Sequence, residues 1–187
     1  MLQFTEKTTA DGKHILGCRP SIMEDVPVIM EGVAYAKETL KKWNVRQWQG
    51  SYPEREDVEN DVVLKRGYTV TCDGEVAGYF VATITEEPIF NAIYDGNWSD
   101  DLPYCTLHRS LVTEKFRHSG IADYMMKCVE EYAVSNNVSY IRSDTHADNK
   151  PMNDLFVRSG YKYCGKVMYP EDFRDIDRAR ICYEKRL

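Results

Sequence analysis

The stretch from Leu107 to Ala133 constrains the fold of this chain most, because it combines a strand, a tight basic loop and a helix in direct succession. Its last part has apolar residues at helical spacing, which predicts an amphipathic helix after Gly120 whose buried face consists of Ile121, Met125, Cys128, Val129 and Tyr132. A helix N-terminus has unpaired N–H groups and a partial positive charge, and glycine lets an anion come close to the backbone. The sequence therefore predicts a diphosphate-binding loop that contains Arg117 and Gly120.

Residues 117–122, Arg-His-Ser-Gly-Ile-Ala, resemble the acyl-CoA-binding signature of the GNAT acetyltransferase superfamily, Arg/Gln-x-x-Gly-x-Gly/Ala. The segment from Asp148 to Tyr161 resembles the second CoA-proximal segment of that superfamily, and the two similarities together cover about residues 104 to 168. A Gln-Trp-x-x-x-Tyr-Pro stretch at residues 47–53 is similar to bacterial members whose substrate is unassigned. The resemblance implies an N-acetyltransferase that moves an acetyl group from acetyl-CoA to a primary amine by direct attack in a ternary complex. The amine would belong to a small molecule or to a protein N-terminus or lysine.

The order of predicted elements gives an α/β (α+β) fold class: a GNAT-like mixed, mostly antiparallel twisted sheet, with a central splayed parallel strand pair flanked by helices. Strands are predicted at residues 14–19, 68–72, 75–84, 107–112, 139–144, 161–168 and 178–185. Asp73-Gly74 predicts a type I′ hairpin. The strand, crossover helix and strand between residues 107 and 144 imply parallel pairing with a right-handed connection.

Three further helices are predicted outside the central unit. Ser21 and Glu24 form a capping box that opens a helix ending near Lys42, an acidic helix spans about 55–65, and a short helix spans 152–158. The long loop 85–103 is expected either to cover a site or to contact a second subunit in a homodimer. The charged loop 169–177 is expected to be solvated.

Length and composition favour one domain over residues 1–187, with 43% hydrophobic residues to build a core. A net charge of −6 argues against non-specific nucleic-acid binding and favours a cationic amine as the acceptor. No apolar run is long enough for a membrane span and the N-terminus lacks a secretory pattern, so a cytoplasmic location is expected. The cysteines form no Cys-x-x-Cys pair, which predicts no metal and no disulfide: Cys18, Cys72, Cys105, Cys128, Cys164 and Cys182.

Acetyl-CoA is the cofactor that the resemblance implies, with no metal. The residues assigned to it are Leu111, Val112, Arg117, His118, Ser119, Gly120, Ile121, Ala122 and Asn149. Backbone groups of Leu111 and Val112 would pair with the pantetheine amides like an added strand, and an amide on the Val112 side would face the thioester oxygen. Asn149 is equally well interpreted as a helix cap before Pro151.

Residues for proton transfer are harder to assign from the sequence. The superfamily often has a tyrosine that protonates the leaving thiolate, where this chain has Phe156, which has no proton to donate. A thiol pKa of about 8.5 makes coenzyme A thiolate a tolerable leaving group that water can protonate. His108, Asp144 and His146 are the titratable groups near the predicted split between strands, and His146 and His108 are the candidate catalytic residues.

Trp48 and Tyr52 resemble residues that face the acceptor in the superfamily, although large aromatic side chains also seal cores. Two alternatives to the enzyme remain open. One is a protein that binds acetyl-CoA or CoA without catalysing transfer, which the phenylalanine at position 156 favours. The other is a phosphate-binding loop in a different nucleotide-binding protein, but no Gly-x-x-x-x-Gly-Lys-Ser/Thr motif or paired-glycine loop is present.

Overall fold

The computed structural model describes residues 6–9 and 12–187. Its strands are β1 (Lys7–Thr8), β2 (Ile15–Pro20), β3 (Gly67–Cys72), β4 (Glu75–Thr83), β5 (Cys105–Val112), β6 (Tyr140–Thr145), β7 (Lys162–Met168) and β8 (Ala179–Arg186). Its α-helices are α1 (Val26–Lys42), α2 (Arg55–Val63), α3 (Ile121–Ser135) and α4 (Lys150–Arg158), with 3-10 turns η1 (Met23–Asp25), η2 (Pro88–Ala92) and η3 (Glu114–Phe116). The predicted strands and helices are therefore present, with small shifts at their ends.

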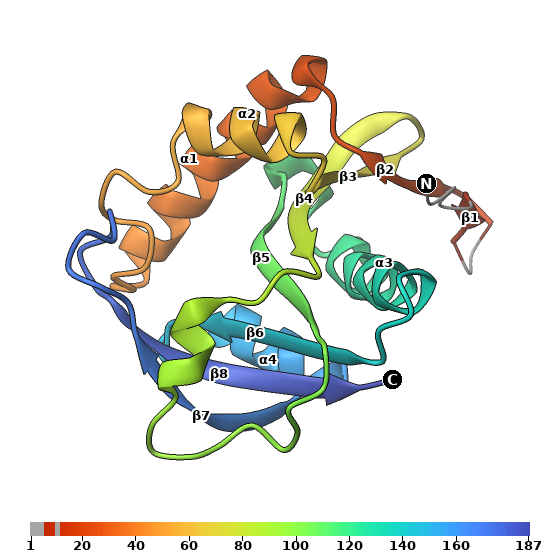
Figure 1. Ribbon diagram of the computed structural model, residues 1–187. Helices are drawn as coiled ribbons and strands as arrows, with labels where there is room; N and C mark the ends of the chain where they lie inside the picture. The colour runs from red at the N-terminus through yellow and green to blue at the C-terminus, as the bar shows by residue number, and fades with distance from the viewer. Residues whose placement is uncertain (1–5, 10–11) are drawn as a thin grey trace.

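The eight strands form one sheet in the order β1-β2-β3-β4-β5-β6-β8-β7, and β5 and β6 are its parallel pair. These two strands pair only where Cys105–Leu107 run beside Ile141–Ser143. Beyond that point β5 stays paired with β4 and β6 stays paired with β8, so the two strands diverge (Figure 1). The predicted GNAT-like sheet with a splayed central pair is confirmed.

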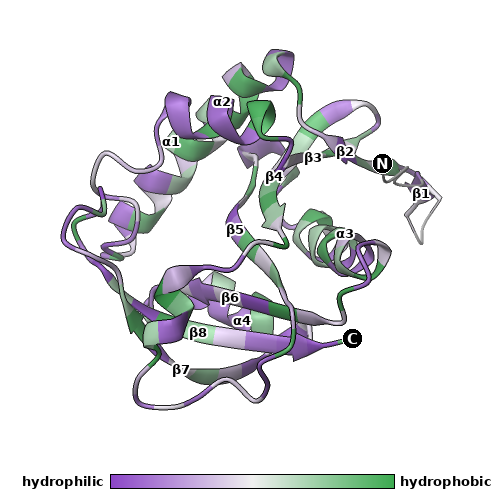
Figure 2. Ribbon diagram, in the orientation of Figure 1, coloured by the Kyte–Doolittle hydropathy of each residue, from purple (hydrophilic) through white to green (hydrophobic). Residues whose placement is uncertain are grey.

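Helices cover both faces of this sheet. Along β4, Tyr79 and Val81 pack in a cluster with residues of α1 and α2, whereas Phe80 and Ala82 pack in a cluster with residues of α3 and α4. This alternation is what a strand buried on both faces requires. In Figure 2 the hydrophobic colour accordingly runs along much of β4, whereas β5 includes a hydrophilic stretch.

The start of α1 differs from the sequence prediction. The Ser21 hydroxyl hydrogen-bonds to the Thr69 hydroxyl at 2.8 Å on β3, so the predicted capping box of Ser21 and Glu24 is wrong. The Asp25 carboxylate instead accepts a hydrogen bond from the Ile22 amide at 3.0 Å. A cross-strand partner was available to Ser21 only after the chain folded, and it displaced the local capping interaction.

The long loop 85–103 lies against β6, β7 and β8. It contains η2, whose Phe90 is fully buried, and residue Tyr94 exchanges backbone hydrogen bonds with Lys166 of β7 at 2.8 and 2.9 Å. The Arg142 guanidinium lies 4.5 Å from the centre of the Trp98 ring and 4.2 Å from that of Tyr104, which fixes the end of the loop to β6. The loop thus covers the outer strands, and its contact with a second subunit remains a prediction.

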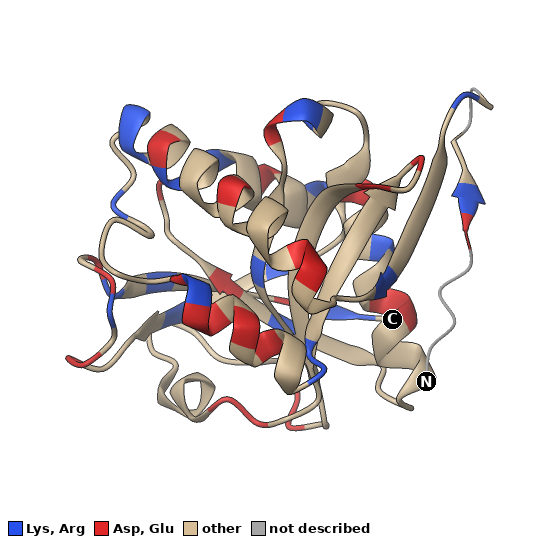
Figure 3. Cartoon of the chain, turned by 90° about the horizontal axis from the view of Figure 1, so that it is seen from above, with Lys and Arg blue, Asp and Glu red and all other residues tan. Residues whose placement is uncertain are grey.

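Charged residues of both signs are spread over the helices and loops. Seen from above, Lys and Arg lie among Asp and Glu along the helices (Figure 3). No helix in the described part of the chain combines the length and the apolar character that a membrane crossing requires.

Candidate active site

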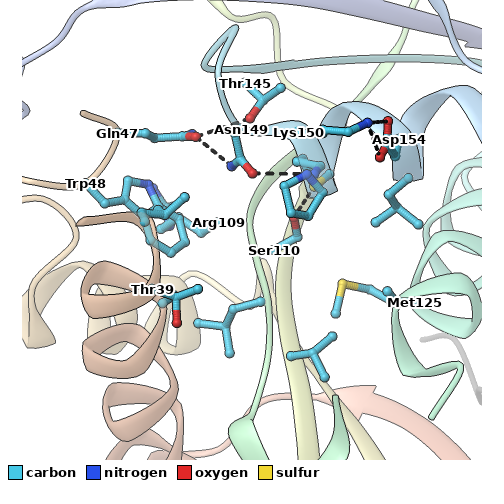
Figure 4. Close-up of a pocket in the computed structure, with 18 of the residues that line it drawn as sticks. Thr39, Gln47, Trp48, Arg109, Ser110, Met125, Thr145, Asn149, Lys150 and Asp154 are labelled. Carbon is cyan, nitrogen blue, oxygen red and sulfur yellow. Dashed lines mark hydrogen bonds and ion pairs between the residues drawn. The ribbon is translucent and has the colours of Figure 1, made fainter. Parts of the chain in front are cut away.

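A cavity of about 830 Å³ occupies the split between β5 and β6 (Figure 4). This volume lies in the usual range for small-molecule and cofactor sites. We call the cavity-lining part of residues 111–125 the loop wall, which runs from the end of β5 to the first turns of α3. We call the cavity-lining side chains of Trp48, Tyr52, Tyr169 and Phe173 the aromatic wall.

The loop wall is built mainly from backbone. Gly120 is the N-cap of α3, with φ of +82°, and a Cβ added there would meet no atom within 4 Å. The first N–H groups of an α-helix have no partner within the helix, so they are available to an anion at this open glycine. Of the predicted loop residues, His118, Gly120, Ile121 and Ala122 line the cavity. Ser119 does not line it, because its hydroxyl is turned back onto the Phe116 carbonyl.

Arg117 also lines the cavity beside this loop. Its guanidinium donates to the Tyr35 hydroxyl at 2.8 Å and lies over the Tyr35 and Trp43 rings, at 5.6 and 5.8 Å from their centres. Lys150 and Arg158, which line the cavity from α4, are paired with Asp154 and Asp123. Within the described ranges, Arg117 has no carboxylate partner, so its charge is available to a phosphate.

The end of β5 presents an open edge to the cavity. The Thr113 amide donates to the Ala77 carbonyl of β4 at 2.9 Å. Successive amides of a strand point to opposite edges, so the Val112 N–H points toward the split instead. Leu111 and Val112 both line the cavity, in the geometry that pairing with an extended amide ligand requires.

Asn149 is the helix cap that the sequence offered as one of its two roles, and it also lines the cavity. It is the N-cap of α4, where its side-chain oxygen accepts from the Met152 amide at 3.4 Å. Its amide nitrogen donates to Gln47 at 2.8 Å (Figure 4). Gln47 also accepts from the Thr145 hydroxyl at 3.2 Å. It belongs to the Gln-Trp stretch, but only the tertiary structure reveals that it links the 47–53 segment to β6 and α4.

His108 is the first β5 residue beyond the part paired with β6, and it lines the cavity. Its Nε2 lies 3.0 Å from the Glu87 carboxylate. Burial alone would raise the pKa of Glu87, but the hydrogen bond from His108 and nearby positive charges hold it below its ordinary value. An ionised Glu87 only accepts hydrogen bonds, so Nε2 carries a proton, and in the neutral ring the lone pair is on Nδ1. Sequence reasoning missed Glu87, because it lies in the irregular loop after β4.

Asp144 is the corresponding residue of β6, directly after Ser143, and it also lines the cavity. Burial raises the pKa of Asp144, against the opposing effects of His108, Arg180 and the Tyr169 hydroxyl. Tyr169 donates to this carboxylate at 3.0 Å, while Arg180 Nε lies 4.0 Å away. Tyr169, Phe173 and Arg180 line the cavity and Asp175 is buried, so the expectation that loop 169–177 is merely solvated is wrong.

His146 lies just past the end of β6 but is not among the residues that line the cavity. Its side chain is buried, and the Asp148 amide donates to its Nδ1 at 3.1 Å. Its Nε2 lies 3.3 Å from the Asp177 carboxylate. Both ring nitrogens therefore have partners within the protein, and the structure brings His108, but not His146, to the cavity.

Phe156 is fully buried and stacks on Tyr183, with 4.8 Å between ring centres. Met152 and Leu155 are the neighbouring α4 residues that line the cavity. The position at which the superfamily often has a proton donor is therefore part of the core in this chain.

The predicted acceptor residues Trp48 and Tyr52 both line the cavity and both pack. Tyr52 accepts a hydrogen bond from Arg109, whose Nε and Nη2 donate to the fully buried Asp61 at 2.7 and 2.6 Å. Burial raises the pKa of Tyr52 despite the nearby Arg109 charge, so its hydroxyl stays protonated at neutral pH. Trp48 and Tyr52 therefore pack in a hydrophobic cluster and line the cavity at the same time.

One group of side chains has the composition of a metal site. His14, Cys72 and Asp73 have ligand atoms within 4.8 Å of one another, among the residues that the structure describes. None of them lines the cavity, and His14 Nδ1 already lies 2.7 Å from the Asp73 carboxylate. This group has no connection to the chemistry of the split.

The family model described as the acetyltransferase (GNAT) family matches residues 37–161, more than half of the chain. The chain belongs to the GNAT acetyltransferase family. Membership implies acyl-CoA-dependent acetyl transfer, and the predicted family is thereby confirmed. A search of curated proteins gave no match.

Solved structures agree with this family. A GNAT-family acetyltransferase from Streptococcus agalactiae is 28% identical, with a TM-score of 0.79, over 92% of this chain and 95% of that one. A GNAT-family acetyltransferase from Listeria monocytogenes is 20% identical, with a TM-score of 0.69, over 98% of this chain and 100% of that one. Mycobacterium smegmatis RimJ, solved in complex with CoA-disulfide, is 13% identical, with a TM-score of 0.62, over 92% of this chain and 82% of that one.

Proposed function

We propose that this GNAT chain is an N-acetyltransferase that transfers the acetyl group of acetyl-CoA to a primary amine by direct attack, and that residues 1–187 act as a single catalytic domain. One observation carries the proposal. A helix N-terminus suited to a diphosphate, an open strand edge suited to pantetheine, and the titratable pair of His108 and Asp144 all border one cavity.

The coenzyme would lie along the loop wall. Amides at the N-terminus of α3, together with the Arg117 guanidinium, would hold the diphosphate, and Gly120 leaves the approach free of side chains. The Val112 N–H would pair with the ligand or polarise the thioester oxygen, and Asn149 would contact the coenzyme arm from α4. His118, Ile121 and Ala122 would complete the contact surface. Ser119 would shape the loop through its bond to Phe116.

His108 would be the general base and Glu87 its positioning residue. Nδ1 of His108 takes a proton from the acceptor ammonium, directly or through one water, and Glu87 stabilises the imidazolium that forms. The amine nitrogen then attacks the thioester carbon, the new C–N bond forms and the C–S bond breaks. As the tetrahedral intermediate collapses, the nitrogen gives up a second proton to water and the leaving thiolate takes a proton from water, so no side-chain acid is required at Phe156. We assign His146 a positioning role, because its ring joins the end of β6 to Asp177.

A protein that binds acetyl-CoA without turnover is the second candidate, and the buried Phe156 favours it. Calorimetric titration with acetyl-CoA, followed by an amine-panel assay for released thiol on the same sample, separates the two. Binding with turnover supports the transferase, and binding without turnover of any amine supports the non-catalytic protein. Absence of acetyl-CoA binding would overturn both.

A further inference from the structure

The aromatic wall brings four rings to the cavity, and the guanidinium groups of Arg109, Arg174 and Arg180 lie 5.6 to 5.8 Å from the centres of three of them. Tyr52 and Phe173 have ring centres 5.1 Å apart, and Phe173 stacks on Tyr169 at 4.2 Å. Trp48 lines the cavity from the same segment as Tyr52. Aromatic faces of this kind favour an aromatic ligand, which stacks on them or meets them edge to face.

The cations on this side of the cavity are already paired. Arg109 is bound to Asp61 through two hydrogen bonds, and Arg180 donates to Asp175 at 2.8 Å. His108 is bound to Glu87. Among the Lys and Arg residues that line the cavity within the ranges described, only Arg117 lacks a carboxylate partner, and the coenzyme diphosphate would occupy it in the proposed function. A ligand carboxylate or phosphate placed against the aromatic wall would lose its hydration without gaining a counter-charge.

Asp144 also lines the cavity. Its Oδ1 accepts from Tyr169, whereas Oδ2 accepts no hydrogen bond from the residues that the structure describes, since Arg180 Nε lies 4.0 Å away, too far for one. Asp144 and His108 each follow the last paired residue of their strand, Ser143 and Leu107. Asp144 and His108 therefore both lie where β5 and β6 begin to diverge. There Asp144 could bind an ammonium and His108 could remove its proton.

On the basis of the proposed function, we propose that the acceptor is an aryl-bearing primary amine without a carboxylate, such as a 2-arylethylamine. Its ring lies on the aromatic wall, and its ammonium group lies between Asp144 and His108. When the ammonium loses one proton to His108, a neutral amine remains beside the Asp144 carboxylate. The nitrogen of this amine then attacks the thioester carbon. This assignment excludes free amino acids, whose carboxylate has no partner, and polyamines, whose further positive charges would meet the guanidinium groups of Arg109 and Arg180 that lie over these rings.

The test compares kcat/KM for four acceptors with acetyl-CoA saturating. These are 2-phenylethylamine, hexylamine without the ring, L-phenylalanine with an added carboxylate, and spermidine with added charges. We expect 2-phenylethylamine to exceed hexylamine by about 10-fold, since an aromatic contact is worth roughly 1 kcal/mol, and to exceed the other two by about 100-fold or more. Turnover of L-phenylalanine or spermidine at a comparable rate would overturn the acceptor class but leave the transferase intact.

A binding experiment separates failure of this inference from failure of the proposed function. Calorimetry of 2-phenylethylamine against the protein saturated with CoA requires no turnover. Asp144→Asn and Phe173→Ala should each weaken this binding about 10-fold without changing the acetyl-CoA affinity. Tyr163→Ala is the matched control, because the Tyr163 ring on β7 is exposed and does not line the cavity. It should leave both affinities unchanged. Acetyl-CoA binding without amine binding contradicts the acceptor class, whereas loss of acetyl-CoA binding in the parent chain contradicts the function itself.

Discussion

The loop wall and the aromatic wall line the same cavity but are built in different ways. The loop wall comes from one continuous stretch, residues 111–125, and offers mainly backbone amides. The aromatic wall joins side chains from residues 48–52 and 169–173, which are more than a hundred positions apart in the chain. A site made of backbone follows from local conformation, whereas a site made of side chains depends on the contacts that hold distant segments together.

Two buried carboxylates provide those contacts. Asp175 accepts from the amides of Trp48 and Gln49 at 2.6 and 3.0 Å and from Arg180 at 2.8 Å, so it joins the two segments of the aromatic wall. Asp61 holds Arg109, which in turn donates to Tyr52. A buried carboxylate is costly unless it is fully hydrogen-bonded, and both of these are. The position of the aromatic wall therefore depends on these two carboxylates, and a single substitution at either one should disturb it.

The largest expected effect tests whether the loop wall binds the coenzyme. Gly120→Trp should lower the acetyl-CoA affinity by about 100-fold or more, because the indole fills the approach to the amides. Gly74→Trp is the matched control, since Gly74 has the same φ of +82° and equally open surroundings in the β3–β4 hairpin. Calorimetry should detect a loss only in Gly120→Trp. An equal loss in both variants would mean that backbone strain, and not the coenzyme site, is responsible.

The next effect tests the assignment of the base. His108→Gln should lower kcat by about 10² to 10⁴, the usual contribution of a general base, with acetyl-CoA binding unchanged. Glu87→Gln should have a smaller effect and should alter the pH profile of kcat/KM, because it removes the charge that stabilises the imidazolium. The control is His14→Gln, since His14 is paired with Asp73 in a similar way but away from the cavity. A normal rate in His108→Gln would remove His108 from the mechanism.

A smaller effect on rate is expected at His146. His146→Ala breaks the buried contacts with Asp148 and Asp177, so it should cost about 1 to 3 kcal/mol of unfolding free energy. The rate should fall by less than about 10-fold, because the ring does not line the cavity. Urea unfolding and thiol release measure the two quantities separately. A loss of kcat as large as that of His108→Gln, with normal stability, would instead identify His146 as the base.

The smallest expected effect is on stability, because keeping the buried Asp144 carboxylate ionised lowers the free energy of unfolding. Burial raises the pKa of Asp144 in the folded protein, so folding favours its protonated form and the ionised form destabilises the fold at neutral pH. Asp144→Asn should therefore raise the unfolding free energy at pH 7 by about 1 kcal/mol, or the melting temperature by roughly 2 to 4 °C. The difference should disappear below the pKa of the unfolded carboxyl. A variant that melts lower at pH 7 would contradict this assignment.

The parts of the site that the sequence predicted are those with a local cause. A glycine before an apolar helical pattern requires a turn and a helix start, whatever the rest of the chain does, so the position of Gly120 and α3 was predictable. The hairpin at Asp73-Gly74 and the splayed strand pair followed from turn chemistry and element order in the same way. Ser21 and Glu24 formed an equally good local pattern, but the Thr69 hydroxyl was a stronger partner for Ser21 once β3 lay beside it.

The sequence alone determined the family, the order of strands and helices and the glycine turn that opens α3, because residues close in the chain set these features. Only the tertiary structure decided which titratable groups reach the cavity. In the folded chain His146 is buried and contacts Asp177, so it does not line the cavity. His108 pairs with Glu87 from an irregular loop, and Phe173 packs between Tyr52 and Tyr169. Those choices depend on burial and on partners far apart in the sequence, and the spacing of residues along the chain contains no record of them.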